Sequence, residues 1–395
     1  MKRVTYISVF ILAAALLVAI TIPQCAAYRA KAPGSDLAYQ QVMYQQMLEE
    51  ASPLRPVNGE PYPDMFFKHY GVNPTIDTAE ERLSTFAADV DTASYTMARS
   101  YLQSGALPPE DAVRVEEFVN YFDYGYQAPE SKAFALTAEA FPSATRKGYH
   151  TLVIGLKGRV IEAKDRKPAN LVFVIDTSGS MDMDNRLGLV KRSLHFLVNK
   201  MRETDSVGIV EYGSSARVVL EPTSGAQASR IKRAIDSLKP TGVTNAEAGI
   251  RLGYDLAHKA LIPGGINAII VLSDGVANSG VTGADGILKV ISQRKKEGIT
   301  ISTIGFGMGN YNDILMEQLA NHGDGNYYYI DQIGQARRVF EQNLTGTLQA
   351  IAKDVKLQVE FDQRNVSRFR LIGYENRIMT DRQFQDEKAD AGEIG

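Results

Sequence analysis

The chain has a single cysteine, Cys25, among its 395 residues. A lone cysteine forms no internal disulfide bond, so the fold must be held by its core whatever the redox state around it. The five histidines are scattered, none stands in an H-E-x-x-H pattern, and no cysteines complete a ligand set. Zinc binding and Cys/His catalysis are therefore unsupported. The motif G-x-x-x-x-G-K-[ST] is also absent, which excludes a P-loop nucleotide motor.

An excess of charge of either sign is missing too. Lysine and arginine together number 43, against 46 aspartates and glutamates. Such a balance provides no field that would concentrate nucleic acid, so we expect no nucleic-acid partner. Hydrophobic residues make up 44% of the chain, and this length can bury one large core and a second, smaller one.

The N-terminus has the pattern of an export signal, which predicts a location in the periplasm or cell envelope. Positive charge in residues 1–3 precedes an almost wholly apolar run, 4–22, and small residues follow up to Ala27. Cleavage after Ala27 is favoured over lipid attachment at Cys25, because Gln24 is a poor residue before a lipidated cysteine. Retention as a membrane anchor stays open, since the run nearly reaches the roughly 20 residues that span a bilayer.

The strongest local signal is the continuous apolar run 171–175, which predicts a buried parallel strand. Asp176, Ser178 and Ser180 follow at its carboxyl end, where open α/β sheets bind ligands. One carboxylate and two alternating hydroxyls can present three oxygens to one point. That arrangement suits a hard divalent cation such as Mg²⁺.

Two later segments bring further oxygen ligands to the same edge of the sheet. Thr244 lies in a loop at the start of an apolar-periodic stretch that is typical of a helix, and Asp274 ends a second buried-strand pattern. We therefore expect five residues to converge on one site: Asp176, Ser178, Ser180, Thr244 and Asp274.

The D-x-S-x-S motif with a distant threonine and a distant aspartate resembles the metal-ion-dependent adhesion site of the von Willebrand factor type A (VWA) domain. The resemblance implies that Ser178, Ser180 and Thr244 contact the metal directly or through water, while Asp176 and Asp274 mostly hold its waters. It implies Mg²⁺, with Mn²⁺ and Ca²⁺ as alternatives, and an open coordination position that accepts an Asp or Glu carboxylate from another protein. The resemblance thus implies a site that binds a partner protein, and we expect no enzymatic activity.

Other interpretations are open at this point. The segment 176–180 could cap a helix that starts near Asn185, and Asp182 with Asp184 could form a second cation site, although solvation of the loop explains them as well. At the level of function, a metal-assisted hydrolase would need a general base beside the metal. A structural envelope protein would use the metal only to rigidify loops.

Strand and helix patterns alternate over residues 169–353, which predicts a doubly wound, mostly parallel α/β sheet of the Rossmann-like VWA type. Residues 213–215 form a hairpin signal, so one edge strand should run antiparallel. The expected strands are 171–176, 206–212, 216–220, 268–274, 300–306 and 326–330.

The flanking segments predict a smaller β-rich domain. After the signal or anchor, 1–27, residues 28–77 are proline-rich like a flexible tether, and residues 78–168 read as helices followed by strands at 134–140 and 149–156. The alternation in 355–361 predicts a strand that returns to that sheet. Motifs at 88–95, 107–109 and 114–122 resemble a bacterial family of exported VWA proteins, the YfbK-like family. Its sequences continue further, so we expect 354–395 to be the truncated start of a C-terminal segment.

The pair Asp89 and Asp91 forms a D-x-D pattern that also occurs in aspartyl-phosphate phosphatases. That chemistry needs a long buried strand just before the pattern, and the apolar run here is short. We expect instead that Asp91 or Thr92 caps a helix at 94–102. A second helix is expected from Val113 to Phe122.

Overall fold

A computed structural model describes residues 64–162, 164–242, 244–275, 284–308, 310–342, 348–386, 389 and 391–394. The predicted signal or anchor and the tether up to residue 63 lie outside the described residues. The remainder of the predicted tether range contains two short strands, β1 (Asp64–Phe66) and β2 (Ile76–Asp77). In the part of the chain that the structure describes, no helix has the length and apolarity needed to cross a membrane.

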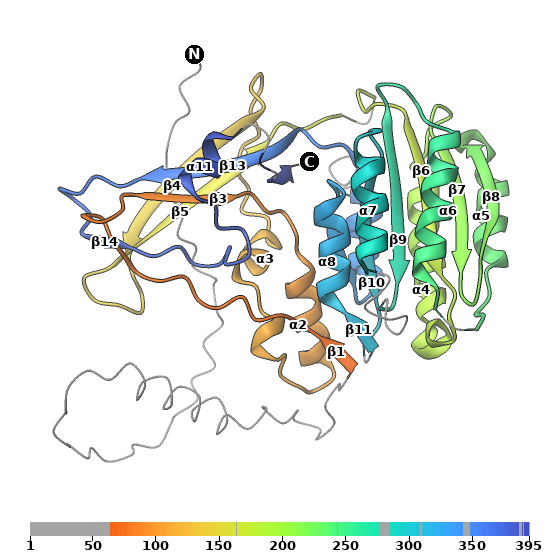
Figure 1. The fold of residues 1–395 in the computed structure, drawn as a ribbon, viewed down its shortest axis with the longest axis horizontal. Coiled ribbons are helices and arrows are strands. Elements are labelled where there is room, and N and C mark those ends of the chain that lie inside the picture. The colour runs from red at the N-terminus through yellow and green to blue at the C-terminus, as the bar shows by residue number, and fades with distance from the viewer. Residues whose placement is uncertain are drawn as a thin grey trace.

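A six-stranded sheet forms the larger part of the molecule (Figure 1). Its strands run in the order β12-β10-β9-β6-β7-β8, and all neighbours are parallel except β7 and β8. The predicted doubly wound sheet with one antiparallel edge strand is therefore confirmed. The strands are β6 (Ala169–Asp176), β7 (Ser206–Tyr212), β8 (Ala216–Ser224), β9 (Ile266–Ser273), β10 (Thr300–Phe306) and β12 (Tyr327–Ile330).

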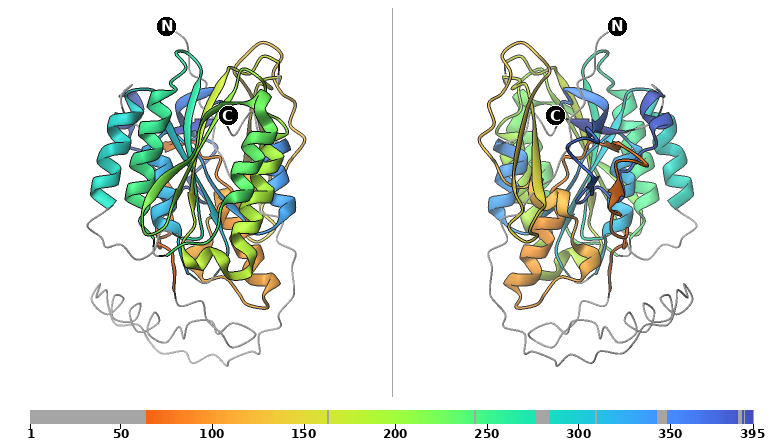
Figure 2. Two further views of the ribbon diagram at one scale, coloured as in Figure 1. Left: turned by 90° about the vertical axis from the view of Figure 1, so that its right-hand side faces the viewer. Right: turned by 90° about the vertical axis from the view of Figure 1, so that its left-hand side faces the viewer.

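Helices cover both faces of this sheet (Figure 2). One face packs against α4 (Arg186–Val198), α5 (Ala228–Ser237) and α9 (Ile333–Arg337), and the other against α6 (Ala246–Lys259), α7 (Ala284–Lys295) and α8 (Asp313–His322). Because both faces are covered, every residue of β6 and of β9 is buried. That is why these strands read as unbroken apolar runs in the sequence.

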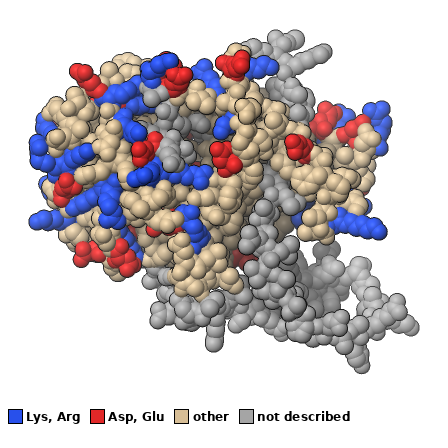
Figure 3. Space-filling model, turned by 180° about the vertical axis from the view of Figure 1, so that it is seen from behind, with Lys and Arg blue, Asp and Glu red and all other residues tan. Residues whose placement is uncertain are grey.

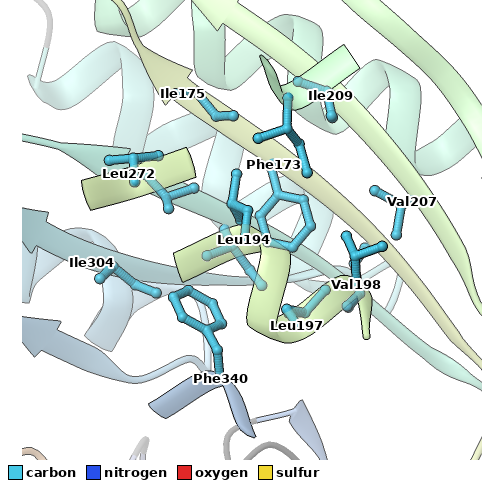
Figure 4. Close-up of a cluster of buried hydrophobic side chains, with 14 of the residues drawn as sticks. Phe173, Ile175, Leu194, Leu197, Val198, Val207, Ile209, Leu272, Ile304 and Phe340 are labelled. Carbon is cyan, nitrogen blue, oxygen red and sulfur yellow. The ribbon is translucent and has the colours of Figure 1, made fainter. Parts of the chain in front are cut away.

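The core on the α4 side shows how the strands are held in place (Figure 4). Phe173 and Ile175 of β6 belong to one cluster with Leu194 and Leu197 of α4, and Phe340 joins it from the short π-helix η4 (Arg338–Gln342). Each such side chain contributes roughly 1.5–3 kcal/mol when it is fully buried. The packing therefore fixes where each strand ends, and with it the position of the polar residues that follow.

Basic side chains gather on the outer surface of the same helices (Figure 3). Lys191 and Arg192 come from α4, and Arg230, Lys232 and Arg233 come from α5. The near balance of charge over the whole chain thus hides a local excess of positive charge on this face.

The segments before and after the large sheet together form a smaller β-rich unit, as predicted. Strand β13 (Ala352–Glu360) lies between β15 (Gly392–Ile394) and β3 (Leu83–Ala87), and β14 (Arg368–Phe369) pairs with β2. The partner of β13 differs from the expected one: among the described residues, β4 (Phe134–Pro142) and β5 (His150–Gly158) pair with each other in a separate two-stranded sheet and not with β13. Residues 83–87 are too few to be recognised as a strand without their partner.

Short helices complete this unit: α2 (Ala93–Gln103), α3 (Val115–Asn120), the turn η1 (Glu110–Ala112) and α11 (Asp381–Gln385). Helix α3 is shorter than predicted, and Val113 and Phe122 lie outside it with 39% and 49% of their surfaces exposed. The predicted capping of α2 is wrong. Thr92 is the N-cap but makes no side-chain capping bond, and Asp91 accepts a 2.9 Å hydrogen bond from the Tyr327 backbone N–H instead.

The smaller unit docks on the β12 edge of the large sheet through α2. The Thr96 hydroxyl donates to the Tyr329 carbonyl at 2.9 Å, and the Arg99 guanidinium makes two 2.7 Å hydrogen bonds to the Asp331 carboxylate. Strand β1 also pairs with β11 (Asn310–Asn312), just before α8. Such contacts cover an edge strand that would otherwise be open to further pairing.

A buried cluster of charged groups joins the two units. Arg114 is 6% exposed; its Nη1 lies 2.7 Å from Asp313 Oδ2 and 3.5 Å from Glu317 Oε2, and its Nε pairs with Glu117. Arg377 pairs in the same way with Asp89 and Asp91, at 3.3 and 3.7 Å. The D-x-D pair therefore lies in ion pairs that hold the C-terminal segment in place.

Acids outnumber bases in this cluster. The Glu116 carboxylate is buried and accepts the Tyr374 backbone N–H at 3.0 Å, and burial next to Asp89 raises the pKa of Glu116 to about 7. Burial likewise raises the pKa of Glu117 to about 8, against the opposing effect of Arg114. Both glutamates titrate near 4.5 when unperturbed, so the folded state holds protons that the unfolded chain releases first.

We expect the protein to lose stability as the pH rises. Protonation of Glu116 and Glu117 favours the folded state below about pH 4.5, and this contribution disappears as the pH passes through their folded-state pKa values, about 7 and about 8. For each proton that the folded state still holds and the unfolded chain has lost, the free energy of unfolding falls by about 1.4 kcal/mol per pH unit. Denaturant titrations between pH 5.5 and 8.5 measure the slope.

The variant Glu116→Gln keeps an acceptor for the Tyr374 N–H but cannot titrate. Its unfolding free energy should depend less on pH than that of the wild type, whereas Glu80→Gln, at an exposed position, should leave the slope unchanged. Equal slopes for wild type and Glu116→Gln would contradict the assignment.

Candidate metal centre

The site lies where the order of strands reverses. The chain passes from β6 to β7 and β8 on one side, then crosses to β9, β10 and β12 on the other. Strands β6 and β9 are parallel neighbours with Ile175 opposite Leu272, so Asp176 ends beside Ser273 and Asp274. A crevice at such a reversal is the usual ligand site of a doubly wound sheet.

The loop after β6 folds back on its own aspartate. The Ser178 backbone N–H donates to Asp176 Oδ1 at 2.8 Å. The 3₁₀ segment η2 (Gly179–Asn185) follows, and α4 begins only at Arg186, after Asn185 in the left-handed region with φ of 56° and no side-chain capping bond. The interpretation of this segment as a cap of that helix is therefore wrong, since five residues separate Ser180, the nearer serine, from α4.

Hydrogen bonds connect four of the five predicted residues. The Ser273 hydroxyl donates to Asp176 Oδ2 at 2.8 Å, the Ser180 hydroxyl donates to Asp274 Oδ1 at 3.0 Å, and the Ser178 and Ser180 hydroxyl oxygens lie 3.0 Å apart. Because Ser180 uses its only proton on Asp274, Ser178 is the donor between the two serines. Both hydroxyls keep lone pairs for a cation.

The fifth residue, Thr244, stands in the adjoining loop. It is half-buried and directly precedes Asn245, whose side chain caps α6 by accepting the Ala248 N–H at 3.1 Å. This loop contacts the serine loop through a 3.0 Å hydrogen bond from the Gly179 N–H to the Gly242 carbonyl. Gly242 has φ of +53°, which an ordinary residue adopts only at a cost.

The carboxylates and Ser178, which is 2% exposed, are buried, and the side formed by Ser180 and Thr244 is partly open to solvent. Asp176 is 0% and Asp274 1% exposed, whereas Ser180 and Thr244 are half-buried. Burial and the nearby Asp274 charge raise the pKa of Asp176 to about 6. Burial also raises the pKa of Asp274, although hydrogen bonds from Arg186 and Ser180 act in the opposite direction. A cation placed here would stabilise both ionised forms.

The donor set fits a small divalent cation. Neighbouring ligands of an octahedral ion with bonds of 2.0–2.1 Å lie about 2.9 Å apart, and the Ser178–Ser180 and Ser180–Asp274 oxygen distances are both 3.0 Å. Among the described residues, no three or more His, Cys, Asp or Glu side chains group to hold a metal. Any cation bound here would therefore depend on hydroxyl oxygens as well as on two carboxylates.

Two contacts of the site were not predicted from the sequence. Ser273 precedes Asp274 and could have been noticed from the β6–β9 pairing alone, whereas Arg186 carries no sequence signal because the left-handed turn at Asp184 and Asn185 brings it inward. Asp184 is 86% exposed on its side chain and Asp182 is exposed as well. This exposure agrees with loop solvation and gives no support to a second cation site.

Three protein-family models match the chain. "von Willebrand factor" covers residues 62–153, "von Willebrand factor type A domain" covers 170–342, and "Uncharacterized protein YfbK, C-terminal" covers 346–395. The Escherichia coli (strain K12) protein "Uncharacterized protein YfbK" is 40% identical over 337 residues, which are 83% of this chain and 59% of that protein. The chain is a YfbK-like VWA protein. The family resemblance noted in the sequence is thereby confirmed.

Two further similarities have lower identity. "Uncharacterized protein sll0103" of Synechocystis is 29% identical over 48% of this chain and 44% of its own length. The solved structure "von Willebrand factor type A from Catenulispora acidiphila" has 18% identity and a TM-score of 0.40, covering 59% of this chain and 53% of that one. The chain spans about half the length of the curated relatives it matches.

The variant Ser178→Ala tests the site directly. It removes one hydroxyl oxygen and a hydrogen bond to Ser180 while leaving the backbone N–H that holds Asp176, so the metal-free protein should melt close to the wild type. We expect Mg²⁺ affinity, measured by calorimetry, to fall by roughly tenfold or more.

Ser292→Ala is the matched control, because Ser292 lies exposed on α7 and bonds only to its own helix. It should bind Mg²⁺ like the wild type. Undiminished Mg²⁺ affinity in Ser178→Ala would remove Ser178 from the ligand set.

Proposed function

We propose that this YfbK-like protein is a protein-interaction module that binds a partner's Asp or Glu carboxylate through a divalent cation. Asp176, Ser178, Ser180, Thr244 and Asp274 would hold the cation, and Mg²⁺ suits their oxygen atoms best. The observation that carries the proposal is the partial exposure of Ser180 and Thr244 beside two buried carboxylates, Asp176 and Asp274. The cation would supply a positive centre with a position open to one further oxygen.

The charge of the site supports carboxylate binding. Two carboxylates face a divalent cation, and Arg186 lies 2.7 Å from Asp274 Oδ2. With one arginine and two ionised aspartates, the loaded site keeps a net positive charge. A carboxylate is the common protein group that would neutralise it.

A hydrolytic function has less support. Hydrolysis at the metal needs a general base beside it, and the two carboxylates of the described site, Asp176 and Asp274, are each engaged by serine hydroxyls. We further propose that the N-terminal apolar run exports or anchors the module at the cell envelope, where its partner would also lie.

Acetate serves as a minimal probe of the proposed function. Acetate should bind the Mg²⁺-loaded protein, as measured by NMR or calorimetry. This binding should be lost when EDTA is added and in the variant Asp176→Asn. A metal that raises the melting temperature while acetate and acidic peptides fail to bind would indicate a purely structural ion. Metal-dependent turnover of a phosphoester or peptide by the pure protein would instead favour the alternative function of a metal-assisted hydrolase.

The role of Thr244 is tested by a pair of variants. Thr244→Val keeps the shape and removes the hydroxyl, so Mg²⁺ binding should weaken by roughly tenfold if that oxygen reaches the cation or one of its waters. Thr244→Ser keeps the hydroxyl and should bind Mg²⁺ nearly as the wild type does. Equal affinities of the valine and serine variants would exclude Thr244 from the site.

A further inference from the structure

A buried arginine stands directly behind the candidate metal centre. Arg186 is the first residue of α4 and its side chain is 3% exposed. Its Nη1 donates to Asp274 Oδ2 at 2.7 Å, while Ser180 bonds to the other oxygen, Oδ1. The two contacts together fix the Asp274 carboxylate from opposite sides.

The guanidinium is itself held from a second direction. Its Nη2 donates to the Met308 carbonyl in the loop after β10. The preceding residue, Gly307, has φ of +78°, and a Cβ atom there would collide with the Arg186 side chain. The Arg186 Nε has no hydrogen-bond partner among the described residues. The enclosed guanidinium thus has little room to move away when a cation enters.

A cation this close to a metal site changes what the site attracts. Asp176 and Asp274 contribute two negative charges, and Arg186 cancels one of them. The Asp184 carboxylate also lies 3.9 Å from Arg186 Nη2, but its side chain is 86% exposed, so solvent and salt screen its charge. A divalent ion then leaves the loaded site with a net charge of plus one, whereas without the arginine the loaded site would be neutral. The guanidinium repels the incoming cation and favours an incoming anion, and in a buried site these effects are weakly screened.

We infer that Arg186 is a positioning residue that holds Asp274 in place and lowers the negative charge of the site, so that the metal is bound less tightly and the partner's carboxylate more tightly. The inference rests on the proposed function. It adds that the selectivity of the loaded site for a carboxylate comes from a residue that touches neither the metal nor the partner.

The test measures two affinities separately: Mg²⁺ alone, and acetate at saturating Mg²⁺, both by calorimetry at one ionic strength. Arg186→Gln should bind Mg²⁺ about tenfold more tightly and acetate about tenfold more weakly than the wild type. Arg186→Lys keeps a positive charge next to Asp274, so both affinities should stay within about threefold of wild type if charge is what matters. Arg251→Gln is the matched control, since Arg251 is a half-exposed arginine paired with Glu247 on α6.

The opposite changes in the two affinities identify the role, because a merely structural loss weakens both. Arg186→Gln that binds both ligands more weakly, or both as the wild type does, overturns the inference. Wild-type protein that binds no Mg²⁺ overturns the proposed function instead, and the two failures are therefore distinguishable. Melting in EDTA verifies that each variant is folded.

Loss of folding in Arg186→Gln would follow from leaving Asp274 buried without its partner. In that case Asp274→Asn is compared with the double variant Asp274→Asn/Arg186→Gln, which has no unpaired buried charge. Removal of the arginine in this background should again tighten Mg²⁺ binding and weaken acetate binding. Unchanged affinities would overturn the inference.

Discussion

The parallel pairing of β6 with β9 is the constraint on which the rest of the site depends. Both strands are buried on both faces, so helix packing fixes their length and register. The polar residues after β6 and β9 therefore begin side by side at the carboxyl ends of the two strands. Asp176 lies next to Ser273 and Asp274 because of this register. The serine and threonine loops are added to this frame by short backbone contacts, such as that between Gly179 and Gly242.

The molecule uses buried carboxylates in two different ways. At the junction of the two units, Glu117 and Asp313 are enclosed with Arg114, and their charges are neutralised inside the protein. At the sheet edge, Asp176 is held by hydroxyl and backbone N–H donors, and Ser180 and Thr244 of the same site are partly open to solvent. Both environments raise the pKa of an acid, so a raised pKa by itself does not mark a ligand site. The accessible lone pairs make the difference.

The large sheet could be predicted nearly strand by strand, because strands that are buried on both faces consist of continuous apolar runs. The smaller unit was harder to predict. Strand β3 has five residues and pairs with β13, which lies more than 260 positions later in the chain. No local sequence pattern therefore predicts this pairing. The expected cap at Asp91 failed for a related reason: the backbone N–H that this carboxylate accepts belongs to Tyr327 on the edge strand β12, far along the chain.

The sequence by itself determined the fold class of the VWA part and predicted five oxygen-bearing residues for one site, because hydrophobic periodicity and the D-x-S-x-S spacing are local properties. Only the tertiary structure decided which carboxylate oxygen each serine engages, that Ser180 is partly exposed beside buried carboxylates, and that Arg186 pairs with Asp274. Those features arise where segments distant in sequence converge. Their geometry is set by packing between helices and strands, and no local sequence pattern encodes it.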